Sequence, residues 1–196
     1  MRVLLVNTSE HTGGASVAAG RLLDALNGNG VKAKMLVTRK TSDRPTVAGL
    51  PAAWRYQASF YAERLAIWTL NGFRRDHLFD VDPAWTGVDI TRLPEFREAD
   101  VIHLHWINQG MLSLGSVRRI LRTGKPVVWT LHDMWPFTGV CHYARECKKW
   151  LTGCHHCELL LHGGGTHDMS ATTFRRKATT YAGARLSFVA CSHWLP

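Results

Sequence analysis

The sequence has no long hydrophobic run and no low-complexity segment. None of its stretches approaches the roughly 18 uncharged apolar residues that a membrane-spanning helix needs. The first residues, 1–7, turn polar too soon for a secretory signal peptide. We therefore predict a folded protein of the cytoplasm, where thiols stay reduced.

Several well-known motifs are missing as well. The chain has no G-x-G-x-x-G dinucleotide fingerprint and no G-x-x-x-x-G-K-[S/T] phosphate loop. It has no G-x-S-x-G elbow, which disfavours a small α/β hydrolase. It also has no RNA-recognition motif.

Acidic residues are scarce. The chain has 15 Asp and Glu against 24 Lys and Arg, a net charge of +9. This balance predicts an anionic partner, which can be a phosphorylated small molecule, an anionic membrane surface or a nucleic acid. The basic residues are dispersed rather than gathered in one arm, so a nucleic acid is the least favoured of the three.

Strand-like and helix-like segments alternate along the 196 residues, which predicts one α/β domain with a doubly wound parallel sheet. The interval 73–98 carries no clear pattern and predicts an irregular connection. A stripe of apolar residues at helical spacing from Trp54 to Trp68 predicts core packing, with an interfacial membrane helix as the alternative. The expected strands are 2–7, 31–38, 99–106, 126–132 and 186–191, and the expected helices are 15–26, 51–72, 111–122 and 170–182.

Gly13 and Gly14 stand where the first strand turns into the first helix. Glycines there let the backbone approach a ligand, and a helix N-terminus offers free N–H groups to an anion. The pair therefore predicts a phosphate contact. The alternative is a tight turn without a ligand.

Histidines mark the ends of two expected strands. Ligands of open α/β sheets bind outside the carboxyl ends of the strands, so His132 is placed to contact a hydroxyl or phosphate, or to transfer a proton. Its alternative is a buried structural role, and Asp133 is expected to cap the following turn. Of the pair His103 and His105, we expect the first to be packed and the second to line a cleft.

Four cysteines lie within 17 residues, at 141, 147, 154 and 157. In a chain without a secretory signal, Cys141, Cys147, Cys154 and Cys157 predict a closed, structural tetrahedral Zn²⁺ site. Two disulfides or free thiols are the alternatives, and His142, His155 and His156 are substitute ligands. Cys191 is expected in the core.

Several of these segments resemble the N-terminal domain of family 4 retaining glycosyltransferases of the GT-B fold, from the branch that builds bacterial surface polysaccharides. The similarity covers nearly the whole chain apart from 41–98. The segments that carry it are Leu4–Asn7 with Gly13–Ala15, Asp100–Asn108, Thr130–Gly139 with Cys141–Tyr143, the Cys-x2-Cys at 154–157, and Ala190–Leu195.

The resemblance implies one half of a two-domain enzyme with the active site between the domains. It implies that Gly13 and Gly14 approach the donor diphosphate, that His132 sits at the reacting centre, and that His105, Trp106 and Asn108 line the acceptor side. No catalytic metal is expected. The implied substrates are a nucleotide-sugar donor and a glycan or lipid-linked acceptor, so the protein is expected to contact the inner face of the membrane.

The resemblance also sets the expected domain organisation. Residues 1–196 would be the acceptor-side domain, with a cysteine-rich loop at 139–158. The donor-binding C-terminal domain is absent from the sequence, which ends at Pro196 just after a new element begins. This piece alone is expected to be inactive. The alternatives are a non-catalytic glycan- or partner-binding α/β module and, less favoured, a zinc-containing nucleic-acid-binding protein.

Overall fold

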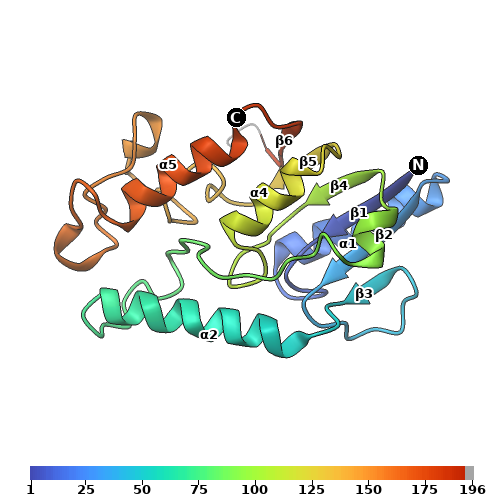
Figure 1. Cartoon of the computed structure of the whole chain (residues 1–196), viewed down its shortest axis with the longest axis horizontal. Helices are drawn as coiled ribbons and strands as arrows, with labels where there is room; N and C mark the ends of the chain where they lie inside the picture. Colours follow the sequence, from blue (N-terminus) through green and yellow to red (C-terminus); the bar gives the residue numbers. More distant parts are fainter. Residues whose placement is uncertain (193–196) are drawn as a thin grey trace.

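Six parallel strands form the centre of the computed structural model, which describes residues 1–192 (Figure 1). Their order across the sheet is β3-β2-β1-β4-β5-β6, and each neighbouring pair is parallel. This is the doubly wound α/β sheet that the sequence predicted. The strands are β1 (Arg2–Val6), β2 (Lys32–Val37), β3 (Val47–Gly49), β4 (Val101–Leu104), β5 (Val127–Leu131) and β6 (Leu186–Ala190).

Two of the helices begin with a side-chain cap, whereas the helices that follow Ala52 and Leu93 have none. The Ser113 hydroxyl accepts the first capping hydrogen bond of α4, and the Asp168 carboxylate does so for α5. Gly13 precedes α1 and supplies no side-chain cap. The helices are α1 (Gly14–Gly28), α2 (Ala53–Leu70), α3 (Pro94–Glu98), α4 (Leu114–Arg122) and α5 (Met169–Tyr181), with short 3-10 turns at Lys149–Leu151 and Leu161–Gly163.

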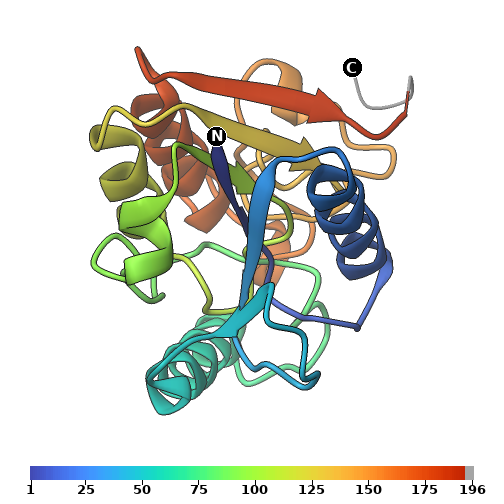
Figure 2. The same ribbon diagram turned by 90° about the vertical axis from the view of Figure 1, so that its right-hand side faces the viewer.

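Apolar side chains of the strands pack into two hydrophobic cores, one on each face of the sheet. On β1, Val3 and Leu5 pack with Leu23 of α1, while Leu4 and Val6 belong to the core under α4. Figure 2 shows α1 on one side of the sheet and α3 and α4 on the other. Because successive strand residues point to opposite faces, a parallel strand buried on both faces needs this unbroken apolar run.

The predicted core packing of the α2 stripe is wrong. Trp54, Tyr61 and Leu65 are 65%, 68% and 57% exposed, and the buried residues of the helix include Glu63 and Arg64. On the inner face of α2, Glu63 and Arg64 meet backbone groups of the irregular segment 73–98, and Ile67 packs in a small apolar core with Val81 and Val140. Polar side chains satisfy those groups, so the aromatic side chains face outward, as the interfacial alternative requires.

Two further differences concern the middle and the end of the chain. The short strand β3 was not predicted, because three residues carry no periodic signal. The element expected to begin at 192–196 lies, from residue 193 onward, outside the described residues. Among residues 1–192, none of the helices combines the length and the apolar character that crossing a membrane requires.

Substitution of two glycines tests how tightly the irregular segment 73–98 is packed. Gly87 lies in this segment, and Gly20 in α1 serves as the comparison. A Cβ added at Gly87 would lie 2.1 Å from the Ser113 nitrogen, whereas one added at Gly20 in α1 would meet no atom within 4 Å. We expect Gly87→Ala to destabilise the fold by roughly 3 kcal/mol or more. Gly20→Ala is expected to stabilise it by about 0.5–1 kcal/mol. Urea unfolding of both variants measures the two effects, and equal stabilities would contradict this packing.

Candidate active site

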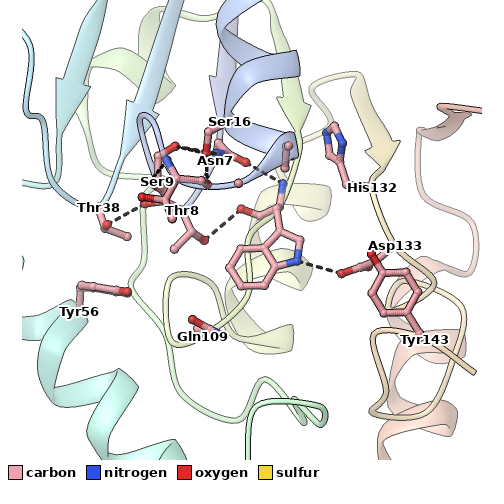
Figure 3. A pocket seen from close by; sticks show the side chains of 15 residues that line it. Asn7, Thr8, Ser9, Ser16, Thr38, Tyr56, Gln109, His132, Asp133 and Tyr143 are labelled. Atoms are coloured by element: carbon pink, nitrogen blue, oxygen red, sulfur yellow. Dashed lines mark hydrogen bonds between the residues drawn. The ribbon is translucent and has the colours of Figure 1, made fainter.

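A pocket of about 690 Å³ opens at the carboxyl ends of β1, β4 and β5 (Figure 3). The strand order reverses between β1 and β4, and ligands of such sheets bind at this switch point. The lining residues are Asn7, Thr8, Ser9, Thr12, Gly13, Gly14, Ala15, Ser16, Thr38, Tyr56, Trp106, Gln109, His132, Asp133 and Tyr143.

Asn7 fixes the floor of the pocket, because it joins the ends of two strands to α1. Its side-chain oxygen accepts the Trp106 backbone N–H at 3.0 Å, and its amide nitrogen donates to the Ser16 hydroxyl at 3.0 Å. Thr8 adds a second link: its backbone N–H donates to the Trp106 carbonyl at 2.8 Å. The strand ends are therefore held together by side-chain bonds beyond the sheet itself.

The Gly13–Gly14 turn forms the rim over this floor. Gly13 has φ +86°, a conformation that favours glycine, and a Cβ on either residue would meet no atom within 4 Å. The first turn of α1 carries no acidic residue and no side-chain cap. Its free N–H groups and the positive end of its dipole therefore face the open pocket and can hold an anion.

Glu10 anchors the loop that leads to this turn. Its carboxylate accepts hydrogen bonds from the backbone N–H groups and the hydroxyls of Thr41 and Ser42. Burial raises the pKa of Glu10, but these bonds outweigh burial and lower it to about 2. The loop after β1 is thus tied to the loop after β2.

Three histidines stack along one face of β4 and β5. The His105 ring lies 4.5 Å from the His103 ring and 5.2 Å from the His132 ring. His105 Nδ1 and His132 Nε2 are 2.9 Å apart, a hydrogen bond. His103 Nε2 bonds the Thr130 hydroxyl at 2.7 Å, and the sulfur of Cys191 lies 3.8 Å from His132 Nδ1.

Burial keeps these imidazoles neutral. It lowers the pKa of His103 to about 4, with His132 acting in the same direction. It lowers the pKa of His105 to about 3, with His103 and His132 adding to the effect. Burial also lowers the pKa of His132, against the opposing effect of Asp133. A neutral His132 bonded through Nε2 can present one ring nitrogen as donor or acceptor.

Asp133 connects the pocket to the cysteine-rich loop. One carboxylate oxygen accepts the Trp106 indole N–H at 2.8 Å and bonds His142 Nδ1 at 2.7 Å. The other accepts the Trp135 backbone N–H at 3.0 Å, which is the turn cap that the sequence predicted. The contact with His142 was not predicted, since eight residues of irregular loop lie between Asp133 and His142.

The structure brings most of the predicted site residues together. Gly13, Gly14, Trp106 and His132 line the pocket. His105 is 3% exposed and lies behind His132 rather than on the pocket wall, and Asn108 is buried as well. Sequence reasoning missed four further lining residues, which are Thr38 after β2, Tyr56 in α2, Gln109 after β4 and Tyr143 in the cysteine-rich loop.

The four predicted zinc ligands also converge. Cys141, Cys147, Cys154 and Cys157 line one small cavity of about 30 Å³, and all four are free thiols. Within residues 1–192, no group of three His, Cys, Asp or Glu side chains is arranged to hold a metal. Cys191, expected in the core, is exposed; its strand β6 is an edge strand with one neighbour, β5.

The pKa of Glu10 gives a pH-dependent prediction. A lowered carboxyl pKa stabilises the fold above the unfolded value of 4.5, and this stabilisation disappears as pH falls through about 2. Glu10→Gln is expected to cost about 1–3 kcal/mol at pH 7 and progressively less below pH 5. Denaturant titrations at pH 7 and below pH 5 measure the loss in the free energy of unfolding. A loss that does not change with pH would contradict the lowered pKa of Glu10.

The buried histidines predict a loss of stability in the same direction as Glu10, at higher pH. The unfolded state binds a proton on each histidine near pH 6.5, but folded His103 does so only near pH 4. Stability is therefore lost as pH falls between these values, by up to about 1.4 kcal/mol per pH unit for each such histidine. His103→Gln should make this dependence shallower.

His167 provides the matched control, because this exposed histidine lies outside the stack. The His167→Gln variant should keep the slope of the wild-type chain. Equal slopes for the wild-type chain and the His103 variant would show that His103 is not held neutral.

Comparisons with known proteins identify the family of the chain. A protein of Escherichia coli (strain K12), whose name assigns it to colanic acid biosynthesis as a glycosyl transferase, is 34% identical over 94 residues. The match covers 45% of this chain and 22% of that relative, well under two thirds of the relative's length. No solved structure matches the chain. The sequence model described as Glycosyltransferase Family 4 matches residues 12–193, and the chain therefore belongs to glycosyltransferase family 4.

Proposed function

We propose that this chain is the acceptor-side half of an enzyme that transfers a sugar from a nucleotide-sugar donor to a glycan or lipid-linked acceptor with retention of configuration. Family membership assigns the chain to glycosyl transfer. The observation that carries the finer proposal is the pocket itself, in which the uncapped start of α1 and the His132 ring share one opening.

The lining of the pocket suits a sugar. It offers hydroxyl groups from Ser9 and Thr12, amides from Asn7 and Gln109, and the aromatic ring of Trp106. Hydroxyl and amide groups both donate and accept hydrogen bonds, which matches the mixed donors and acceptors of a sugar ring. Aromatic faces pack against the apolar face of such a ring.

The donor diphosphate needs more positive charge than this pocket has. Among the described residues that line it, none is Lys or Arg, and Asp133 is the one carboxylate. The free N–H groups at Gly14 and Ala15 supply part of the stabilisation of the leaving diphosphate. The proposal therefore places the remaining cations on a second domain. This agrees with the match to the Escherichia coli relative, which covers 22% of that protein.

In the proposed reaction, the bond between the anomeric carbon and the diphosphate oxygen breaks. A new bond forms from the acceptor hydroxyl to the same face of that carbon, and the hydroxyl proton passes to the departing diphosphate. His132 would contact the transferred sugar and orient the acceptor hydroxyl, with its ring held by His105. Asp133 would hold Trp106 in place through the indole N–H.

The test uses the gene product as its own cells make it, whatever its length. A panel of nucleotide sugars is offered with glycan and lipid-linked acceptors, and nucleoside diphosphate release is measured. We expect His132→Ala to lower transfer roughly 100-fold or more, because the acceptor hydroxyl and the sugar lose a positioning contact. NMR of the product is expected to show the anomeric configuration of the donor.

His167→Ala is the matched control, since this exposed histidine does not line the pocket, and it should transfer sugar like the wild type. If the native protein binds glycans but transfers no sugar from any donor, the non-catalytic alternative replaces this proposal. An inverted product would contradict the retaining mechanism alone.

A further inference from the structure

The cysteine-rich loop places four thiols around one point. Cys141 stands at its beginning, Cys147 in its middle, and Cys154 and Cys157 near its end, yet all four line the same cavity of about 30 Å³. None of them is in a disulfide. A cavity of this size is too small for an organic ligand but has room for a single ion.

Backbone contacts hold three of the four cysteines in place. Cys141 pairs with Val81 in an isolated antiparallel bridge, and the Cys147 N–H donates to the Ala144 carbonyl at 2.9 Å. The Cys157 N–H donates at 3.0 Å to Asp168, the residue that caps α5. The convergence of the thiols is therefore built into the fold of the loop.

Cys154 is held most closely. The Gly139 N–H donates to its sulfur at 3.1 Å. A Cβ on Gly139 would lie 2.9 Å from the Cys154 Cβ and 2.7 Å from the Ser170 carbonyl oxygen. Glycine is thus the residue that lets the two arms of the loop approach each other.

A buried cation stands beside the cluster. Lys177 is 2% exposed, and its ammonium group donates to the carbonyls of Trp135, Thr138 and Gly139. Among the described residues, no carboxylate lies within ion-pair distance of this ammonium group. Burial lowers the pKa of Lys177 to about 7, and the charges of Asp82 and Asp133 oppose that effect from farther away. A buried cation without a paired anion is costly, so its surroundings call for negative charge.

We propose that Cys141, Cys147, Cys154 and Cys157 bind one structural Zn²⁺ ion, as four thiolates in a tetrahedral site. Four thiolates around Zn²⁺ carry a net charge of −2, which supplies the negative charge that Lys177 lacks. The sulfur atoms in the described residues are not arranged as ligands. The proposed site therefore requires the cysteine side chains to rotate about χ1 so that their sulfur atoms face the cavity they line.

This ion would fix one wall of the pocket. Between Cys141 and Cys147 lie His142, which bonds Asp133, and Tyr143, which lines the pocket. With all four positions taken by cysteine, the ion has no open site and takes no part in bond breaking. The zinc site does not depend on the proposed function, because it follows from the loop and Lys177 alone.

The first test measures metal and thiols in the native protein, purified under reducing conditions without chelator. We expect one zinc per chain by elemental analysis. A thiol reagent should modify the exposed Cys191 at once and the other four thiols slowly, with zinc released as they react. No metal with five freely reacting thiols, two disulfides in the native protein, or an iron–sulfur absorption spectrum would each overturn the proposal.

Variants give the second test. The double variant Cys154→Ser, Cys157→Ser should contain no zinc, whereas the matched control Cys191→Ser should retain it. If the double variant does not fold, wild-type protein reconstituted with Co²⁺ decides instead. Sulfur-to-cobalt charge-transfer bands with intense visible bands indicate tetrahedral thiolate binding. Weak octahedral bands, or no bound cobalt, would contradict the site.

Discussion

The parallel register of β1, β4 and β5 is the constraint on which the site depends. Leu5 pairs with His103, and the His105 N–H continues the ladder by donating to the Val6 carbonyl. The polar residues that follow each strand must therefore gather at one edge. Segments that are far apart in the sequence therefore meet at this edge. This is why His105 and His132, which follow different strands, share a hydrogen bond.

The irregular segment 73–98 helps to position side chains at the pocket. Buried polar groups join α2 to the turn after β4: the Glu63 carboxyl accepts the Trp85 N–H at 2.9 Å, and Asp82 accepts the Gln109 N–H at 2.7 Å. Burial, and then the charge of Asp82, raise the pKa of Glu63 to about 8, so this carboxyl keeps its proton at neutral pH. Together these bonds hold Tyr56 and Gln109 at the pocket.

Close backbone contacts complete the same junction. Gly110 has φ +83°, and a Cβ there would lie 2.6 Å from the Phe60 nitrogen of α2. Helix α2 therefore rests directly on backbone. This agrees with the polar residues Glu63 and Arg64 at buried positions beside Ile67, and with the aromatic side chains on the outer surface of the helix.

The features that the sequence could predict are local. Apolar runs end in polar residues at Asn7 and His132, and the Gly13–Gly14 turn stands before a helix, so strands, helix and candidate pocket could be located from the sequence. The orientation of α2 could not be predicted, because the apolar stripe from Trp54 to Trp68 has the same spacing whether it faces a core or solvent. The contact between Asp133 and His142 depends on the path of a loop without periodicity.

The most direct measurement is a crystal structure of the native gene product with a nucleotide sugar and an unreactive acceptor analogue. Our account predicts the transferred sugar between Gly14 and His132, with its diphosphate facing the start of α1. A donor bound elsewhere, such as in the groove lined by Arg2, Lys32 and Lys34, would contradict it.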